Sequence, residues 1–575
     1  MITQIKDQIT QTLKVIGIEA AEFSIPPKED MGEIAFPCFQ IAKIDGRNPA
    51  EVATELASKL NELFTKEDMK QSSLIKEVKA YGPYVNFFLD EKELAQFVLS
   101  GIDKKYGSHD IGKKKQILIE YACPNPMKVF HLGHLKNLIT GEAVVRVFEN
   151  AGYDVKRVNY QGDVGMHIAK SLWGIFDWPD QFDAMKKETD IRKKVEFLGQ
   201  AYAHGAKAYV DDPDSEAEIR RLNEMVYEKD KSIQDVYKTG RTWSLEYFDT
   251  IYKKLGSHFD GMYFESETFE RGIELIQEGK EKGIFKESDG AVIFPGSEYD
   301  LHDRVFLNSK GYPTYEGKEL SLAEKHFTDF DPYKVIHVVG KEQTGYFQVV
   351  FRALELLMPK TKGREHHLIG GYLQLKGNAK MSSRTGNVIT GDALLFSVEE
   401  KIRSIMQESD KESDDELIHA VTSAALKYAM LKSDVTKDTS FDFEESVSTS
   451  GDSGPYLLYI VARINSILEK VQDTDGKQSQ IFDFQSPISA EEKQLLLLLA
   501  RYPEVTKQAV DSYDPSYIAR YTFDLAQGFN AFYANCQVIG AEDEVREFRI
   551  ALIRSVKDVM TKGLHLLGIE TVEKM

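Results

Sequence analysis

Apolar and polar positions follow different patterns in successive regions of the chain. Apolar residues recur at steps of three and four between Ile2 and Ile16, which predicts an amphipathic helix. Within 78–89 a Gly-Pro pair separates two apolar runs, a pattern that predicts paired strands. The Gly- and Lys-rich stretch 101–115 is typical of a domain boundary. We therefore expect an N-terminal α+β domain over residues 1–110.

The middle of the chain, residues 111–404, alternates short apolar runs with stretches of helical periodicity. The apolar runs include 117–119, 335–339 and 367–373. Alternation of this kind predicts a parallel sheet with helices on its faces. Residues 180–260 are strongly charged and helical in pattern. We interpret them as a helical insertion between the two halves of the sheet.

Residues 405–575 have a helical pattern nearly throughout, which predicts a helix bundle. The expected fold class is therefore multidomain. It combines an N-terminal α+β domain, a parallel-sheet α/β domain with a helical insertion, and a C-terminal all-α bundle.

Composition narrows the class of protein. The 575 residues carry a formal net charge of −20, which excludes a uniformly basic nucleic-acid binder but not a locally basic face. Cys38, Cys123 and Cys536 lie far apart, which excludes a disulfide scaffold or Cys-based zinc site and fits a reducing compartment. No segment approaches the roughly 18 apolar residues of a membrane helix. We expect a soluble, cytoplasmic protein without a signal peptide.

The densest chemical signal is residues 117–137, with the sequence ILIEYACPNPMKVFHLGHLKN. An apolar strand ends, a Pro-containing turn follows, and His131-Leu132-Gly133-His134 begins a helix. A helix N-terminus presents free N–H groups and partial positive charge to phosphates. His131 and His134 can face one ligand, and Gly133 lets a flat base approach the backbone. The alternative is a pair of surface histidines beside a helix cap.

The second signal is residues 376–390, KGNAKMSSRTGNVIT, in which Lys380 and Arg384 flank Ser382 and Ser383. A Gly-rich loop of this kind can bring positive charge and hydroxyls onto a reacting triphosphate. A solvated basic loop is the alternative, and it would be favoured if the motif stood alone.

Together the two motifs resemble those of the class I aminoacyl-tRNA synthetases. HLGH is similar to their HIGH signature, and KMSSR is similar to their KMSKS signature. The resemblance implies a Rossmann-like catalytic domain that binds ATP. Mg²⁺ should accompany the ATP, but we see no dedicated protein site for a metal. The residues placed at ATP by this resemblance are His131, Gly133, His134, Lys380, Met381, Ser382 and Ser383.

The resemblance narrows to the arginyl-tRNA synthetase family over essentially the full length. It rests on YACPNPMKVFHLGHLKN, GYPTYEGKELSLAEK, HVVGKEQTGYFQVVFRAL, GDSGPYLLYIVARINSIL and the C-terminal VKDVMTKGLHLLGIETVEKM. It implies an arginine–tRNA ligase of protein synthesis whose partners are ATP, L-arginine and tRNA(Arg), with no membrane or DNA partner. A monomer is the family-based expectation, with an anticodon-binding C-terminal domain and an N-terminal domain that contacts the tRNA body.

Five residues form the arginine pocket by this resemblance, and their chemistry suits the substrate. A guanidinium is planar and always charged, so it favours carboxylates and flat hydrogen-bond partners. Glu120 and Glu319 can supply the carboxylates, and Tyr315 lies one helical turn before Glu319. Asn125 and Gln343 are neutral and suit the amino and carboxylate ends of the amino acid. Taken singly, each acid would usually be a solvated surface charge.

Some positions depart from the family pattern. Glu319 stands where the family usually has Asp, and Ser383 stands where KMSKS has Lys. Lys128 can supply that missing charge or be purely structural. His167 can line the ATP or arginine site or pack in the core. We expect His131 and His134 at the transition-state phosphate, and Lys128, Lys380 and Arg384 at the departing pyrophosphate.

Two rival functions stay open at this point. One is activation of another amino acid, with specificity moved by Glu319; the other is a catalytically silent RNA-binding relative. Basic and aromatic residues of the C-terminal helices suit an anticodon loop, because splayed bases stack on aromatic rings. They also suit an ordinary bundle. These residues are Lys427, Lys432, Arg463, Arg501, Arg520, Arg554, Tyr459, Phe529 and Tyr533.

Overall fold

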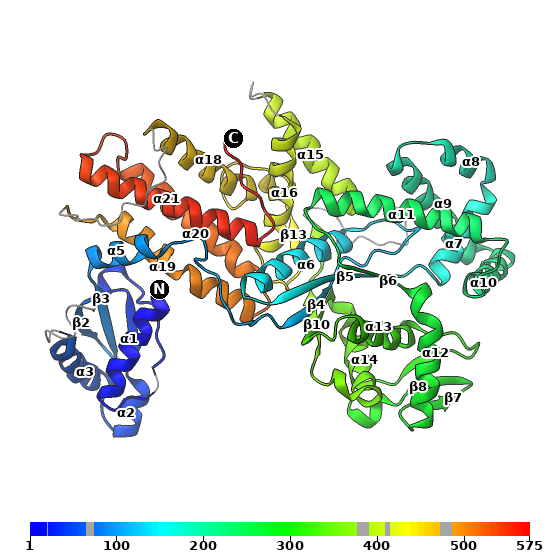
Figure 1. Ribbon diagram of the computed structural model, residues 1–575, viewed down its shortest axis with the longest axis horizontal. Coiled ribbons are helices and arrows are strands. Elements are labelled where there is room, and N and C mark those ends of the chain that lie inside the picture. Colours follow the sequence, from blue (N-terminus) through cyan, green and yellow to red (C-terminus); the bar gives the residue numbers. More distant parts are fainter. Residues whose placement is uncertain (20, 65–73, 377–389, 409–413, 472–485) are drawn as a thin grey trace.

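The computed structural model describes residues 1–575 except 20, 65–73, 377–389, 409–413 and 472–485 (Figure 1). A five-stranded sheet stands at its centre, in the order β11-β10-β4-β5-β6, and every neighbouring pair is parallel. The predicted parallel-sheet α/β fold is therefore confirmed. Its strands are β4 (Gln116–Glu120), β5 (Asp154–Gln161), β6 (Gly261–Phe264), β10 (Lys334–Gly340) and β11 (Glu365–Gly370).

Strand order reverses between the central strand β4 and its neighbour β10. In open α/β sheets, ligands bind at the carboxyl ends of the strands where the order reverses. The predicted strand 367–373 is broken at the end of β11, and Leu373 begins β12 (Leu373–Leu375), which pairs instead with β13 (Thr439–Phe441). The break is enforced at Gly371, where a Cβ would lie 2.0 Å from a backbone oxygen of Lys437.

The two faces of the sheet have different partners because side chains alternate along a strand. Ile119 and Ile336 belong to the core that includes α6 (Leu132–Asn150) and the C-terminal helices. Leu118 and Val335 point the other way and pack with Leu322 on α13. The helices that complete this half are α12 (Glu265–Glu281), α13 (Tyr315–Asp329), α14 (Thr344–Leu357) and the 3-10 turns η3 (Lys341–Gln343) and η4 (Pro359–Thr361).

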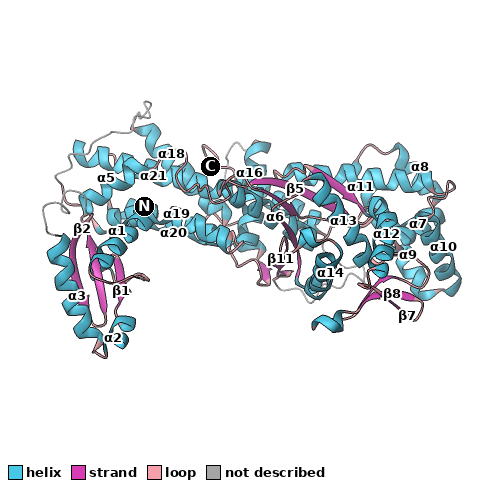
Figure 2. Cartoon of the chain, turned by 60° about the horizontal axis from the view of Figure 1, so that its bottom comes forward, coloured by secondary structure: helices cyan, strands magenta, loops and turns pink. Residues whose placement is uncertain are grey.

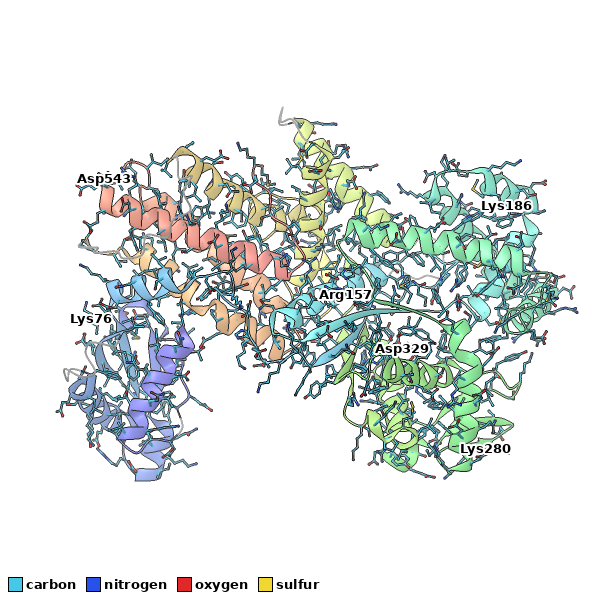
Figure 3. All side chains as sticks on the ribbon, viewed as in Figure 1. Lys76, Arg157, Lys186, Lys280, Asp329 and Asp543 are labelled. Atoms are coloured by element: carbon cyan, nitrogen blue, oxygen red, sulfur yellow. The ribbon has the colours of Figure 1, made fainter. Side chains whose placement is uncertain are left out.

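A buried ion network ties the sheet to α6. Arg157 on β5 donates to Glu149 at 2.7 Å and lies 3.4 Å from Glu142, and Arg146 also donates to Glu142. Figure 3 shows Arg157 in the crowded centre of the molecule. Because both acids are on α6, the helix that begins at the HLGH motif is held in register against the sheet.

The helical insertion joins β5 to β6 and extends to the right in Figure 1. It has its own core, which contains Leu172, Phe197 and Trp243. The helices are α7 (Met166–Asp177), α8 (Pro179–Lys187), α9 (Ile191–Asp211), α10 (Pro213–Tyr227) and α11 (Gln234–Lys254).

A small antiparallel sheet between α12 and α13 was not expected from the sequence. Its strands are short, so they carry little periodicity. Thr314, just before α13, donates its N–H to Phe306 O at 3.0 Å, so this sheet fixes where α13 begins. The elements are β7 (Lys286–Ser288), β8 (Ala291–Phe294), β9 (Arg304–Leu307) and the 3-10 turn η2 (Gly296–Tyr299).

The N-terminal domain confirms both of its predicted elements. The apolar stripe of α1 (Ile2–Val15) is buried, and β2 pairs antiparallel with β3 across the Gly-Pro turn. Its elements are α1, η1 (Glu29–Met31), β1 (Ile34–Pro37), α2 (Phe39–Asp45), α3 (Pro49–Phe64), β2 (Ile75–Tyr81), β3 (Tyr84–Leu89) and α5 (Glu91–Gly101).

The C-terminal helix bundle is also confirmed, and it connects the other two parts. Tyr106, in the stretch read as a boundary, donates to Leu499 O at 2.7 Å, so this connector is docked on the bundle. Figure 2 shows the N-terminal domain at one end of the molecule and the insertion at the other. Among the described helices, none combines the length and apolar character that crossing a membrane requires. The bundle contains α15 (Gly391–Glu408), α16 (Asp415–Leu431), α17 (Phe443–Ser446), α18 (Gly454–Lys470), α19 (Ala490–Asp511), α20 (Ser516–Asn535) and α21 (Asp543–Leu566).

Candidate active site

The candidate site lies where β4 ends and α6 begins, at the reversal of strand order. The loop between them is strained: Ala122, Cys123 and Met127 all have positive φ, at 70°, 50° and 58°. Non-glycine residues adopt this conformation at a cost, and they concentrate at functional sites. The loop turns the chain sharply from Glu120 to the histidines at the start of α6.

His131 and His134 form a capping box at the N-terminus of α6. His131 Nδ1 accepts from His134 N at 3.3 Å, and His134 Nδ1 accepts from His131 N at 3.2 Å. The rings stack with centroids 3.4 Å apart. Because each Nδ1 accepts a hydrogen bond, a neutral ring must carry its proton on Nε2. Both rings can therefore donate from Nε2.

Both histidines are neutral at physiological pH. Burial, and after it the charge of Lys128, lowers the pKa of His131 to about 4. Burial, His131 and Lys128 lower the pKa of His134 well below its ordinary value. The pair therefore adds hydrogen-bond donors to a helix N-terminus without adding a titrating charge.

We expect no ionisation near pH 6.5 in the turnover number. A histidine with its ordinary pKa would produce an acid limb there. Measuring kcat between pH 5.5 and 8 at saturating substrates checks this, and a limb near pH 6.5 that disappears in His134→Gln would contradict the neutral assignment.

The end of the second motif lies beside the start of α6. Thr390, just after the undescribed segment, forms an antiparallel bridge with His131, and Gly391 donates its N–H to Phe130 O at 2.7 Å. On the other side, buried Lys136 of α6 donates to Gly371 O at 2.7 Å. Residues on both sides of the undescribed segment are thus held beside α6. Lys380, Met381, Ser382, Ser383 and Arg384 themselves lie outside the described residues.

Lys128 and His167 lie against the helical insertion. Lys128 Nζ is 5.5 Å from the ring centroid of Tyr202 on α9, and burial, then Lys170, lowers its pKa. His167, at the start of α7, lies 2.7 Å from Gly162 O, and burial lowers its pKa to about 4. His167 thus braces the turn after β5.

Glu120 and Glu319, both expected in the arginine pocket, meet in one buried cluster. Glu120 ends β4, and Glu319 reaches it from α13; both side chains are less than a tenth exposed. His337 of β10 lies beside both acids, with Nδ1 3.4 Å from Glu120 Oε1 and 4.0 Å from Glu319 Oε1. His337 is paired with Glu120 in the strand register, so both side chains point to the α13 face.

Sequence reasoning missed further members of this cluster. Glu365 of β11 lies 2.9 Å from His337 Nε2, and the Tyr346 hydroxyl lies 3.1 Å from Glu319 Oε2. A usable signal was present in His337, because it is the polar residue within the apolar run 335–339. Glu365 and Tyr346 carried no such signal.

Burial and repulsion leave Glu319 protonated over much of the neutral range. Burial, then the charge of Glu120, raises the pKa of Glu319 to about 8. Burial also disfavours a charged Glu120, but His337 outweighs it and lowers the pKa of Glu120 below its ordinary value. At neutral pH Glu120 is therefore ionised, whereas Glu319 keeps its proton until a bound cation stabilises its carboxylate.

The other predicted arginine residues are spread around this cluster. Tyr315 is exposed, and its carbonyl lies 3.3 Å from the Tyr346 hydroxyl. Asn125 packs so closely on Gly162 that a Cβ there would lie 2.6 Å from its Oδ1, so a larger residue would have to displace the amide. Gln343 is exposed at the end of η3, and Tyr346, one turn later, contacts Glu319 through its hydroxyl.

The cluster is suited to a flat organic cation. Polar atoms of Glu120, Glu319 and His337 lie within 4.8 Å of one another, a spacing that would also allow a metal ion. However, His337 already forms an ion pair with Glu120, and a metal ion would have to displace its proton. A guanidinium can instead approach Glu120 Oε2, which is buried and lacks a hydrogen-bond partner within the described part of the chain.

Family comparisons match three successive parts of the chain. The family described as Arginyl tRNA synthetase N terminal domain matches residues 3–89. The family tRNA synthetases class I (R), catalytic domain, matches residues 96–443. The DALR anticodon binding domain matches residues 457–575.

Whole-chain comparisons agree with these matches. The chain is 32% identical to an arginine–tRNA ligase of Clostridium botulinum (strain Alaska E43 / Type E3), over 99% of this chain and 100% of the relative. It is 33% identical to one of Treponema denticola, over 98% and 96%. Thermus thermophilus arginyl-tRNA synthetase superposes with a TM-score of 0.80 at 24% identity, covering 100% of both chains. The enzyme of Plasmodium falciparum gives 0.75 at 20%, covering 100% and 98%. These two structures share the fold.

Proposed function

This chain belongs to the arginyl-tRNA synthetase family, and we infer that it is an arginine–tRNA ligase. It uses ATP to convert L-arginine to arginyl-adenylate and transfers the arginyl group to the 3′ end of tRNA, releasing diphosphate and AMP. The observation that carries this function is the junction of two sites at the end of β4. An acidic pocket lies on one side of the strained loop, and a phosphate-binding helix N-terminus lies on the other.

Activation needs positioning and charge stabilisation rather than covalent catalysis. The arginine carboxylate attacks the α-phosphate of ATP. His131 and His134 donate from Nε2 to the phosphoryl oxygens as charge develops. Lys128 contributes positive charge at the departing diphosphate, together with Lys380 and Arg384 of the second motif.

Mg²⁺ is proposed to arrive with ATP rather than in a protein cage. Within the described residues, the one cluster with metal-compatible spacing is the acidic pocket, which the substrate cation occupies in this proposal. Mg²⁺ readily uses phosphate oxygens and water as ligands. It would supply charge neutralisation on the phosphates.

We propose that the arginine guanidinium enters between Glu120 and Glu319, with Tyr315 at the open side and Asn125 near the α-amino end. Glu120 is already ionised, whereas Glu319 must release its proton to form a second ion pair. Arginine binding is therefore coupled to proton release. The Glu at position 319 keeps the acid of the family pattern and extends its reach by one methylene.

Arginine affinity should increase with pH up to about pH 8. Glu319 has a raised pKa in the free protein and a lower one beside a guanidinium, so KM for arginine should fall by up to about tenfold per pH unit between pH 6 and 8. Calorimetry in two buffers of different ionisation enthalpy should detect close to one proton released at pH 7. A flat KM profile in the unaltered protein, identical to that of Glu319→Gln, would contradict this prediction.

For tRNA, the C-terminal helices present an aromatic and basic cluster. Arg463 lies over the rings of Tyr459 and Tyr533, at 4.6 and 5.4 Å, and Tyr533 is exposed. We propose that this cluster contacts the anticodon stem-loop. The prediction of RNA contact is wrong for two other residues, because both are buried. Lys427 donates to Gly568 O, and Phe529 lies in the core.

Aminoacylation of bulk tRNA with labelled arginine tests the function directly. Diphosphate exchange with each amino acid in the presence of tRNA separates arginine from its rivals. Faster exchange with lysine or glutamine would show a different amino-acid specificity. Absence of turnover with retained tRNA binding would indicate a silent relative.

We propose that the protein is cytoplasmic and monomeric. Sedimentation at several concentrations tests the monomer.

A further inference from the structure

His337 is a buried imidazole held between acids from two neighbouring strands. Nδ1 lies 3.4 Å from Glu120 Oε1 on β4, and Nε2 lies 2.9 Å from Glu365 Oε2 on β11. The side chains of all three are at most 5% exposed. Phe347 and Phe351 of α14 pack on the imidazole, with ring centroids 4.9 and 5.6 Å away. The mechanism above assigns no role to His337 or Glu365.

The two carboxylate oxygens of Glu120 have different surroundings. Oε1 faces His337 at 3.4 Å and the Cys123 thiol at 3.9 Å. Oε2 is buried with no hydrogen-bond partner in the described residues. An ionised carboxylate in such surroundings is costly unless it is paired with a cation. His337 supplies this pairing. It contacts Oε1 and so leaves Oε2 available for the substrate.

We propose that His337, held by Glu365, is a positioning residue that keeps Glu120 ionised and leaves Glu120 Oε2 free for the guanidinium of arginine. The proposal rests on the proposed function of this pocket as the arginine site. The imidazolium is shared between Glu120 and Glu365, so Glu120 stays ionised and can pair with the guanidinium through Oε2.

The ionisation of the cluster agrees with this geometry. Burial by itself would lower the pKa of His337, but Glu120 and Glu365 outweigh it and raise that pKa well above its ordinary value. His326 is neutral nearby, because burial lowers its pKa to about 4. The titratable groups that face the cluster are Glu120 and Cys123 from β4 and its loop, Tyr160 from β5, Glu319 and His326 from α13, Tyr346 from α14, and Glu365 and His367 from β11.

The test is the pH profile of KM for arginine in His337→Gln and His337→Phe. Gln keeps a hydrogen-bond donor without the charge, and Phe keeps a ring among the neighbouring phenylalanines.

Without the imidazolium, Glu120 should hold a proton in the neutral range. Arginine binding would then require release of two protons instead of one. KM for arginine at pH 7 should rise by about tenfold or more, and its pH dependence should steepen and approach two protons. Values of kcat and of KM for ATP should change little, because the lost interaction is equal in ground and transition states.

Glu365→Gln should give a smaller change in the same direction, since it removes one of the two acids that hold the charge on His337. Replacing His337 alone leaves Glu365 buried without its partner, so the double variant His337→Phe/Glu365→Gln is measured as well. His366→Phe is the matched control: it is the next residue on β11, faces the opposite side of the sheet and stacks with Tyr513. It should retain the wild-type profile.

The outcomes separate two failures. If the unaltered protein shows no arginine-dependent turnover, the proposed function is wrong. If the unaltered protein charges tRNA with arginine, but His337→Gln and the double variant keep the one-proton profile, then only the role of His337 is overturned. A loss of kcat together with a lower melting temperature, at unchanged KM slope, would make His337 a structural residue and likewise overturn the proposal.

Discussion

Glu120→Gln should lower kcat/KM for arginine by about 100- to 1,000-fold. The substitution keeps the shape of the side chain but leaves a buried guanidinium opposite a neutral amide. Removing one partner of a buried charge pair typically costs about 3 to 4 kcal/mol, which corresponds to this range. The loss should fall mainly on KM for arginine, since the guanidinium is remote from the reacting carboxylate.

The measurement is arginine-dependent diphosphate exchange at saturating ATP and tRNA. Glu324→Gln is the matched control, because Glu324 lies five residues after Glu319 on α13 and pairs with Arg271 on the protein surface. Surface pairs contribute little, so this control should stay within about twofold of the unaltered protein. Similar kinetics for Glu120→Gln and the control would place the guanidinium elsewhere.

His134→Ala should reduce kcat for arginine activation by about 100- to 1,000-fold, while tRNA affinity stays close to normal. It removes an Nε2–H donor aimed at developing phosphoryl charge, and losing one such donor typically has an effect of this size. The anticodon-binding domain, residues 457–575, is distant from His134 in sequence and does not include this ring, so tRNA affinity should not depend on it.

Loss of the helix cap must be separated from loss of the donor. His134 also accepts from His131 N, so Ala weakens the start of α6 by about 1 kcal/mol. Gln at this position can complete a capping box, as it commonly does. His134→Gln should therefore restore the melting temperature but not kcat. Recovery of kcat in His134→Gln would show that His134 acts through the helix cap alone.

Much of the fold followed from local pattern. The spacing of apolar residues in α1, the Gly-Pro hairpin between β2 and β3, and the strand-turn-helix at HLGH are all encoded within short stretches. Helices and strands have periods that can be read from neighbouring residues. The three-stranded sheet β7-β8-β9 was missed because its strands of three and four residues are too short for a period to appear.

The candidate site was predictable in its chemistry but not in its full membership. The resemblance named Glu120 and Glu319, and the fold brings them together. It could not name Glu365 or Tyr346, although the Tyr346 hydroxyl contacts Glu319. Such contacts join segments that are distant in sequence, and no local periodicity specifies which of them meet.

By itself, the sequence determined the helices and strands with a clear period, the two nucleotide motifs and the presence of acids that suit a guanidinium. Only the tertiary structure decided the strand order that places Glu120 beside His337, and the charges that those groups carry. The reason is physical. Secondary structure depends on neighbours within one or two turns, whereas a pKa depends on burial and on charges from other strands and helices. His131 and Glu319 have shifted pKa values because of what the fold packs around them.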